Sequence, residues 1–356
     1  MNILIDIGHP AHVHYYRNFI KIMESKGHKF FITSRNKEIE QYLLNKYKIP
    51  YFNRGTGAKS IVGKIVYMIK ADCLIFREAL KFKPDMFLSF GSIYPSHVSF
   101  LLRKPHIAFD DTEHSTGQYK LYSPFTEVVL TPSCFTRDLG KKQIRFNGYM
   151  ELCYLHPNYF TPDPSILDLL EVKQDEKYVI MRFVSWNASH DVGHSGLSLE
   201  MKRKAVNELS KYAKVFISSE GELPDDLKKY QIKIPPEKMH DALAFATLFV
   251  GEGATMASEC ACLGTPAIYV NSLTAGTLEE QEKYGLLFGF RNSYGVIEKA
   301  IELLNTPNLK EEFQNRRQKM LADKIDVTAF FVWFIENYPD SAKIMKENPD
   351  YQYNFK

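Results

Sequence analysis

The chain of 356 residues contains little cysteine, little net charge and no long apolar run. Its five cysteines are an odd number without framework spacing, which favours reduced thiols over a disulfide scaffold. Cys260 and Cys262 lie two apart on an expected helix, so they point to different sides and make a poor metal clamp. The net charge of +3 is too small to imply nucleic acid as a partner.

The most apolar run, residues 242–250 with Thr247 inside it, is about half as long as a membrane span needs to be. The N-terminus enters a strand pattern without a basic leader region. We therefore expect a cytoplasmic protein that is not integral to a membrane.

Short apolar segments alternate with helical patterns along the whole chain. Expected strands lie at residues 2–7, 29–33, 86–90, 106–109, 128–130, 178–183, 214–218 and 248–250. Strands separated by helices predict parallel sheets with helices on both faces, an α/β fold. In such sheets ligands lie beyond the carboxyl ends of the strands.

Residues 147–165 contain three prolines and no clear periodicity, which marks a domain boundary. We expect one Rossmann-like domain over residues 1–155 and a second over residues 165–326. The aromatic residues of segment 327–356 are too many to leave in water. We therefore expect this segment to form a C-terminal helix that packs back on the first domain.

Residues 248–271 have the pattern of a strand, a turn, a helix, a turn and a strand. Gly251 and Gly253 allow a sharp turn and a close approach of another molecule to the backbone. Thr255 is the expected N-cap of the helix. The free amides and the dipole of a helix N-terminus favour an anion such as phosphate. Glu259 is too far along the helix to cap it, so its carboxylate is available to ribose hydroxyls.

Seven residues of this region resemble the donor-binding signature of the GT-B glycosyltransferases, and most closely that of the peptidoglycan N-acetylglucosaminyltransferases. They are Gly253, Ala254, Ser258, Glu259, Gly264, Pro266 and, after a short insertion, Gln281. The resemblance implies a GT-B fold of two Rossmann-like doubly wound domains with a cleft between them. It also implies that the helix N-terminus meets the nucleotide diphosphate, that the acid binds ribose and that the glutamine contacts the donor sugar.

Two shorter segments add to this resemblance. Residues 8–13, Gly-His-Pro-Ala-His-Val, are similar to the first loop of the same enzymes but lack most of its glycines. Residues 110–114, Asp-Asp-Thr-Glu-His, resemble the His-x-Glu region of the UDP-N-acetylglucosamine 2-epimerases, which share the fold. Over nearly its whole length the chain looks like a GT-B-like family of bacteria and archaea that is labelled as a domain of unknown function (354).

Side chains at the expected carboxyl ends of the first domain's strands are candidates for catalysis. His12 and His14 suit a general base, because the unperturbed imidazole pKa lies nearest neutrality. Asp111 and Glu113 compete for that role as carboxylates whose pKa a closed site could raise. Each of the four also has a structural interpretation as a helix-start or loop residue with a local hydrogen bond. The expected acceptor-binding residues are His9, Gly91, Ser92 and His114.

The second domain supplies the expected donor-binding residues. Arg182 and Asn187 are candidates for the diphosphate, because a guanidinium stabilises the charge on a departing nucleotide. The segment with Glu220 borders the base or the sugar. His190 and His194 lie four apart, but no third ligand stands at a recognised spacing, so we expect no metal site. The expected donor set is Arg182, Asn187, Glu220, Gly253, Ala254, Thr255, Ser258, Glu259 and Gln281.

Residues 54–83 contain seven Lys or Arg against Asp72 and Glu78, interleaved with apolar residues. Two interpretations stay open. The segment is either a helix that covers the sheet and shows a basic face to water, or a basic amphipathic helix that lies on an anionic membrane. A lipid-linked acceptor would explain the second interpretation.

These features predict a cytoplasmic or peripheral-membrane glycosyltransferase of polysaccharide biosynthesis. It would move a sugar from a nucleotide-diphosphate donor, in the first place a UDP-sugar, to a glycan or lipid-linked acceptor. Neither a cofactor nor nucleic acid is expected, and no Asp-x-Asp metal motif is evident. Two alternatives stay open: a UDP-N-acetylglucosamine 2-epimerase or hydrolase, and a non-catalytic subunit that binds a nucleotide sugar.

Overall fold

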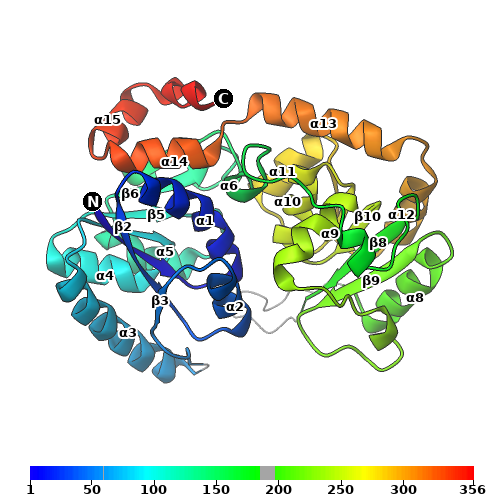
Figure 1. Cartoon of the computed structure of the whole chain (residues 1–356), viewed down its shortest axis with the longest axis horizontal. Helices are drawn as coiled ribbons and strands as arrows, with labels where there is room; N and C mark the ends of the chain where they lie inside the picture. Colours follow the sequence, from blue (N-terminus) through cyan, green and yellow to red (C-terminus); the bar gives the residue numbers. More distant parts are fainter. Residues whose placement is uncertain (59, 185–196) are drawn as a thin grey trace. The chain divides into compact units, whose positions relative to one another are not determined.

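The computed structural model describes residues 1–58, 60–184 and 197–356, and it divides into two compact units. Unit 1 comprises residues 1–154 and 325–356, and unit 2 comprises residues 155–324. In each unit helices surround a parallel sheet, as Figure 1 shows. The α/β fold class that the strand-helix alternation predicts is confirmed.

Unit 1 contains a seven-stranded sheet in which all neighbouring strands are parallel. The strand order is β3 (Tyr51–Asn53), β2 (Lys29–Ser34), β1 (Asn2–Ile7), β4 (Met86–Phe90), β5 (His106–Phe109), β6 (Val128–Pro132) and β7 (Gln143–Phe146). The chain builds the sheet outward from β1 to β3 and then from β4 to β7. The neighbours β1 and β4 are therefore a topological switch point, where such sheets bind ligands at the carboxyl ends.

The helices of unit 1 come from both of its chain segments. They are α1 (Pro10–Ser25), α2 (Glu38–Lys46), α3 (Ile61–Phe82), α4 (Ile93–Leu102), α5 (Thr116–Tyr122), η1 (Ser123–Phe125), η2 (Gly140–Lys142), α14 (Val327–Glu336), α15 (Asp340–Glu347) and η5 (Pro349–Phe355). The short helix α6 (Leu152–Leu155) contains the first unit boundary.

Unit 2 contains a five-stranded sheet, also parallel throughout. The strand order is β12 (Leu287–Phe290), β11 (Ala267–Val270), β10 (Leu248–Gly251), β8 (Tyr178–Phe183) and β9 (Lys214–Ser219). Its helices are α7 (Ile166–Leu169), α8 (Leu199–Leu209), η3 (Lys228–Tyr230), η4 (Pro236–Lys238), α9 (Met239–Phe245), α10 (Ala254–Leu263), α11 (Gly276–Lys283), α12 (Val296–Asn305) and α13 (Leu309–Asp323). The switch point of this sheet lies between β8 and β10.

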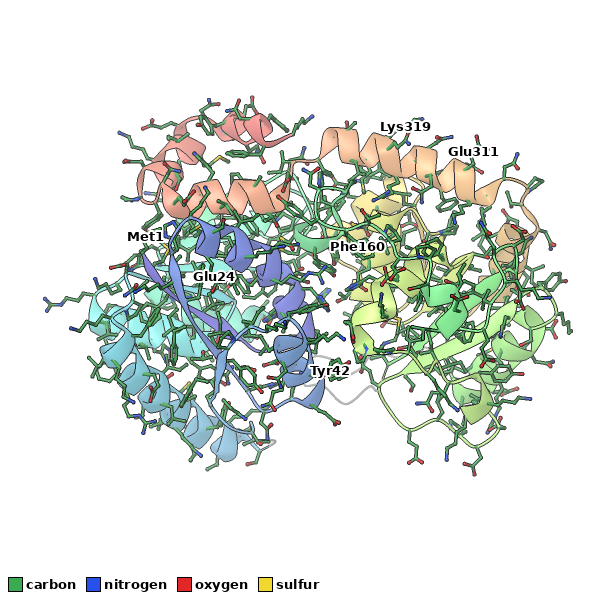
Figure 2. All side chains as sticks on the ribbon, viewed as in Figure 1. Met1, Glu24, Tyr42, Phe160, Glu311 and Lys319 are labelled. Atoms are coloured by element: carbon green, nitrogen blue, oxygen red, sulfur yellow. The ribbon has the colours of Figure 1, made fainter. Side chains whose placement is uncertain are left out.

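Helices cover both faces of each sheet, so the central strands are apolar at nearly every position. In β1 the side chains of Ile3, Leu4, Ile5 and Ile7 have no exposed surface. On α13, Glu311 and Lys319 are exposed, and Figure 2 shows both on the outer side of the helix. Among the described residues, no helix is both long enough and apolar enough to cross a membrane.

The C-terminal residues 325–356 complete the core of unit 1. The Asp326 carboxylate caps α14 by accepting a hydrogen bond from the Ala329 amide at 2.9 Å. The Phe331 ring lies 4.5 Å from that of Phe109 on β5, centroid to centroid. The segment forms α14, α15 and η5, whereas the sequence pattern suggests a single helix.

Candidate functional site

The loop between β10 and α10 lies at the switch point of unit 2. Arg182 on β8 and Gly251 on β10 are paired in register. Gly253 is the N-cap of α10, and its carbonyl accepts a hydrogen bond from the Ala257 amide at 3.1 Å. No side chain caps this ten-residue helix. Its first-turn amides therefore lie at the carboxyl edge of the sheet and favour an anion there.

The prediction that Thr255 caps this helix is wrong, because the helix begins before it, at Ala254. The turn can be this tight because it packs on the stem of Arg182. A Cβ atom on Gly253 would lie 3.3 Å from Arg182 Cγ, and one on Gly251 would lie 2.7 Å from Arg182 Cβ. Ala254 is exposed and Thr255 is half-buried, so both border the helix N-terminus.

The structure brings two of the predicted donor residues together, Arg182 and Glu220. Arg182 Nη1 donates to Ser218 Oγ at 2.8 Å, and Nη2 donates to Glu220 Oε1 at 2.8 Å. The Glu220 side chain is 43% exposed. An exposed ion pair of this kind contributes about 1 kcal/mol or less, so a bound anion can compete with Glu220 for the guanidinium. Asn187, and the His190 and His194 pair, lie outside the described residues.

Glu252 is a buried acid that sequence reasoning missed. Its Oε1 accepts from the Leu197 amide at 2.7 Å, and its Oε2 accepts from the Val184 amide at 3.0 Å. Lys202 Nζ lies 2.9 Å from Oε2. This carboxylate therefore holds β8 and the start of α8 against the turn. An acid placed between two glycines at a strand end is the signal that could have identified it.

Three of the predicted donor residues lie inside unit 2. Gln281 has no exposed surface, and its Nε2 donates to Ser258 Oγ at 2.8 Å. Glu259 is 5% exposed, and its Oε1 lies 3.0 Å from His240 Nε2. These side chains join α10 to α11 and α9, so in this arrangement they support the turn and are almost entirely buried.

A pocket of about 240 Å³ lies beside the carboxyl ends of β8 and β9. Phe183, Lys202, Ser219 and Leu223 are among its lining residues. The Lys202 ammonium also lies 4.8 Å from the centre of the Phe183 ring. The pocket thus combines the Phe183 ring with the Lys202 ammonium of α8 and the Ser219 hydroxyl of β9.

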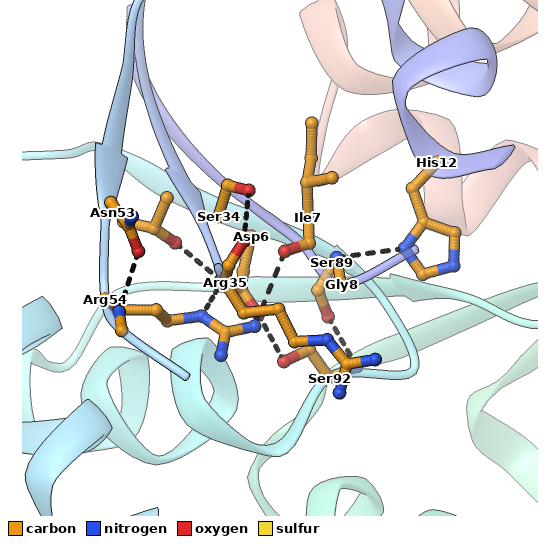
Figure 3. Close-up of polar contacts among 12 residues, drawn as sticks. Asp6, Ile7, Gly8, His12, Ser34, Arg35, Asn53, Arg54, Ser89 and Ser92 are labelled. Carbon is orange, nitrogen blue, oxygen red and sulfur yellow. Dashed lines mark hydrogen bonds and ion pairs between the residues drawn. The ribbon is translucent and has the colours of Figure 1, made fainter. Parts of the chain in front are cut away.

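In unit 1 the loop after β1 ends at His9, the N-cap of α1, and His12 lies in the first turn of that helix. His9 is exposed and caps α1 through Nδ1, which accepts from the Ala11 amide at 3.2 Å. His12 Nδ1 accepts from the Gly8 amide at 3.4 Å, as Figure 3 shows. An uncharged imidazole that accepts at Nδ1 carries its proton on Nε2. His12 therefore offers a hydrogen-bond donor at Nε2 in this arrangement.

The charge state of His12 follows from its surroundings. Burial lowers its pKa well below 6.5, and the positive charges of Arg35, Lys37 and Arg54 lower it further. His12 is therefore neutral at neutral pH. His14, the other candidate base, faces away from the loop: it is buried and stacks on Tyr154 at 5.2 Å between ring centroids.

A buried ion pair beneath this loop is a second feature that sequence reasoning missed. Arg54 Nε donates to Asp6 Oδ1 at 2.8 Å, and Figure 3 shows the guanidinium turned toward Asp6 and the Ile7 carbonyl. Asp6 also accepts from Thr33 Oγ1 at 2.6 Å and from Ser92 Oγ at 2.5 Å. Ser92, a predicted acceptor residue, therefore links the ends of β4 and β1. An acid in an otherwise apolar strand is the signal for this pair.

The arginine of this pair is held in its charged form. Burial alone would lower the pKa of Arg54, but the charge and the hydrogen bonds of Asp6 raise it. The pair also supports the loop above it, because Arg54 Nη2 donates to the Ile7 carbonyl at 3.4 Å.

The loop after β5 contains a pair of carboxyl groups, Asp110 and Asp111. Asp110 is buried and accepts from Tyr122 Oη at 2.6 Å and from the Thr112 amide at 2.8 Å. Asp111 is half-buried. Burial, and then the neighbouring charge of Asp110, raise the pKa of Asp111 to about 7. Asp111 can therefore exchange a proton near neutral pH.

The other predicted residues of unit 1 differ in their placement. Glu113 is buried and accepts from the Thr136 amide at 2.8 Å, which is a structural role. His114 is exposed. Gly91 has a positive φ of 55°, and its carbonyl accepts from Gln118 Nε2 at 2.6 Å.

Comparison with known proteins identifies the family. The profile described as "Protein of unknown function (DUF354)" matches residues 1–331. The chain belongs to the DUF354 family. The uncharacterized protein MJ0665 of Methanocaldococcus jannaschii is 24% identical to this DUF354 protein over 279 residues, which are 75% of this chain and 81% of that protein.

Solved structures with this fold include two kinds of enzyme. A UDP-GlcNAc 2-epimerase from Neisseria meningitidis bound to UDP-GlcNAc has a TM-score of 0.66 and 14% identity, with 90% of this chain and 99% of that chain covered. The spinosyn rhamnosyltransferase SpnG complexed with spinosyn aglycone has a TM-score of 0.60 and 12% identity, with 95% and 100% covered. These likenesses confirm the GT-B fold.

In this DUF354 protein the candidate functional groups thus lie at the carboxyl ends of the strands, at or next to the switch point of each sheet. Unit 2 offers uncapped helix amides, Arg182 and an adjoining pocket. Unit 1 offers a neutral imidazole and a carboxyl group that titrates near neutrality. Within residues 1–58, 60–184 and 197–356, no three His, Cys, Asp or Glu side chains gather as metal ligands would.

Proposed function

We propose that this protein binds a nucleotide-diphosphate sugar, in the first place a UDP-sugar, through unit 2. The observation that carries the proposal is the coincidence of an uncapped helix N-terminus, two packed glycines and Arg182 at the β8–β10 switch point. The solved 2-epimerase of the same fold was bound to UDP-GlcNAc, and the fold also serves a rhamnosyltransferase.

The reaction that we propose is transfer of the sugar to a glycan or lipid-linked acceptor. We assign the binding of this acceptor to unit 1. The bond between the anomeric carbon and the diphosphate oxygen breaks, and a bond forms between that carbon and an acceptor hydroxyl oxygen. The α10 amides and Arg182 stabilise the charge that grows on the departing diphosphate. Arg182 becomes available when the phosphate oxygens replace the Glu220 carboxylate.

The proton of the acceptor hydroxyl needs a base. Asp111 is the best candidate, because its pKa of about 7 leaves an ionised fraction at neutral pH and keeps the carboxylate basic. His12 carries a proton on Nε2 in this arrangement, so we assign it a hydrogen bond to an acceptor oxygen. His9, Gly91 and His114 border the same edge of unit 1 and remain candidates for acceptor binding.

A second candidate function is epimerisation or hydrolysis of a UDP-sugar without an acceptor. The pair of Asp110 and Asp111 favours it, because burial raises the pKa of both carboxyl groups and the pKa of about 7 lets Asp111 give or take a proton near neutral pH. A non-catalytic role as a nucleotide-sugar-binding subunit is the third candidate, and it would leave the same donor site in place.

One measurement tests nucleotide-sugar binding, and two more separate the three functions. A thermal-shift screen with UDP, UDP-GlcNAc and other nucleotide sugars should show stabilisation that grows with ligand concentration. NMR of UDP-GlcNAc incubated with the protein alone would show an epimer or a free sugar for the second function and no change for a transferase. Radiolabelled sugar transfer to lipid and glycan extracts then distinguishes a transferase from a binding subunit.

The donor site itself is tested by Gly253→Val. The added side chain meets Arg182 and fills the approach to the α10 amides, so affinity for UDP should fall at least about tenfold in titration calorimetry. Gly117→Ala is the control, because a Cβ atom there meets nothing within 4 Å. Unchanged UDP affinity in Gly253→Val would show that the donor site lies elsewhere.

A further inference from the structure

Helix α3 covers the sheet of unit 1 with one narrow face. Tyr67, Ala71, Ile75 and Ala79 recur every four residues and are buried. Ile75 and Ala79 pack in one core cluster with Leu4 of β1. This row fixes which side of the helix faces inward, since residues four apart lie on the same face.

The opposite side of α3 is apolar and exposed. Ile61 is 78% exposed, Val62 71%, Ile65 51%, Val66 60% and Ile69 57%. Each residue turns the helix by about 100°, so Ile65 and Ile69, two positions from the buried row, lie about 200° away from it, and Val66, one position from it, lies about 100° away. Ile61 and Val62 stand one turn earlier on the same side. A helix on a globular protein normally shows polar residues there. We call these five residues the outer apolar face.

Among the residues of α3, cations border the outer apolar face and neither acid is exposed. Lys64, Lys70, Arg77 and Lys81 are all exposed. The two acids of the helix are engaged with partners. Asp72 Oδ2 lies 2.9 Å from His97 Nδ1, and Glu78 accepts hydrogen bonds from both Arg77 and Lys81 at 2.9 Å.

The first interpretation of residues 54–83, a helix that covers the sheet and shows a basic face to water, describes only part of α3, because its solvent side is also apolar. Most of its branched apolar residues face solvent. The residues that are buried are Tyr67, Ala71, Ile75 and Ala79. An exposed apolar patch with a polar rim marks an interaction surface. The chemistry of the rim decides which kind of partner fits.

We propose that α3 docks unit 1 on an anionic lipid surface. The outer apolar face enters the boundary between headgroups and acyl chains, and Lys64 and Lys70 lie among the anionic headgroups. The outer apolar face extends about 12 Å along the helix axis, from Ile61 to Ile69. A second copy of this chain fits less well, because two identical faces would bring their cations together.

Vesicle co-sedimentation of the full chain tests the proposal. The wild type should co-sediment with vesicles of phosphatidylcholine mixed with phosphatidylglycerol. Vesicles of phosphatidylcholine alone should bind it at least about fivefold more weakly. Ile65→Glu combined with Ile69→Glu should lower the partition coefficient at least about tenfold. Lys64→Gln combined with Lys70→Gln should also lower it about tenfold, and salt should weaken the wild type.

The matched control is Leu169→Glu on α7 of unit 2, a leucine that is 53% exposed. It should leave the partition coefficient within about twofold of the wild type. All the substituted residues are exposed, so the Tm of each variant should stay close to that of the wild type. The assay contains no nucleotide sugar, so its outcome is independent of the proposed transferase activity.

Three results would overturn the proposal. The first is a wild type that stays in the supernatant with the anionic vesicles. The second is Ile65→Glu with Ile69→Glu binding these vesicles as the wild type does. The third is a wild-type dimer in light scattering that this double variant converts to a monomer, because the outer apolar face would then belong to a second copy.

Discussion

Asp111→Asn should make unit 1 more stable at alkaline pH than the wild type. The structure raises the pKa of Asp111 from 3.8 to about 7, chiefly by burial. When folding raises the pKa of a carboxyl group, its protonated form stabilises the folded state, and this stabilisation is complete at a pH below the pKa of the unfolded state. The stabilisation is lost as the pH rises through the pKa of the folded state, because the folded protein must then hold a charge that burial disfavours. An asparagine carries no such charge.

The size of the effect follows from the two pKa values. At 1.36 kcal/mol per pH unit, the rise from 3.8 to about 7 corresponds to at most about 4 kcal/mol. About 2.7 kcal/mol of this is lost between about pH 5 and about pH 8.5, because the unfolded carboxyl group is already ionised at pH 5. Solvent screens a half-buried charge, so we expect Asp111→Asn to gain about 1 to 2 kcal/mol over the wild type across this range.

Urea unfolding followed by tryptophan fluorescence measures this difference. The chain has two tryptophans, and Trp333 on α14 is the one in unit 1. In a Trp186→Phe background the signal therefore reports unit 1 alone. The matched control is Asp350→Asn in η5, at an exposed aspartate of the same unit. It should change the free energy of unfolding equally at about pH 5 and at about pH 8.5. A difference between Asp111→Asn and wild type that does not grow with pH would refute the reasoning.

Two further substitutions test the buried contacts behind each switch point. Arg54→Met leaves the Asp6 carboxylate buried without its cation, so the free energy of unfolding of unit 1 should fall by about 3 to 5 kcal/mol in the same fluorescence assay. Asp6→Asn combined with Arg54→Met should recover part of that loss, and no recovery would speak against the pairing. Glu259→Ala removes the partner of buried His240 and should destabilise unit 2 by about 1 to 3 kcal/mol in thermal unfolding without ligand. Glu259→Gln keeps an acceptor oxygen and should retain most of that stability; an unchanged Tm for Glu259→Ala would leave Glu259 available for ribose instead.

The sequence predicted the central strands of both sheets well and missed three edge strands. Segments such as 2–7 and 178–183 are recognisable because burial on both faces demands an unbroken apolar run. The missed strands β3, β7 and β12 lie at sheet edges and are only three or four residues long. Short edge strands need fewer apolar residues, so their pattern does not stand out from that of a loop.

The glycine turn of residues 251–253 was also recognisable from the sequence, whereas the direction of the side chains behind it was not. Ser258, Glu259 and Gln281 match a donor-binding signature in their order along the chain. In the folded unit, contacts with α9 and α11 bury them. Hydrogen bonds between residues about twenty positions apart leave no local pattern, so only the packing of α10 shows which of its residues border the turn.

By itself, the sequence determined the α/β alternation, the two switch-point loops and the basic, apolar character of residues 54–83. Local periodicity and turn chemistry are enough for these features, because each depends on neighbouring residues. Only the tertiary structure decided that Asp6 pairs with Arg54, that Asp111 is the carboxyl group with a pKa near neutrality, and that α3 turns the isoleucines of its first turns outward. The physical reason is the same in each case: burial and charge pairing depend on neighbours in space, and a helix with apolar residues on two sides does not specify which side meets the sheet.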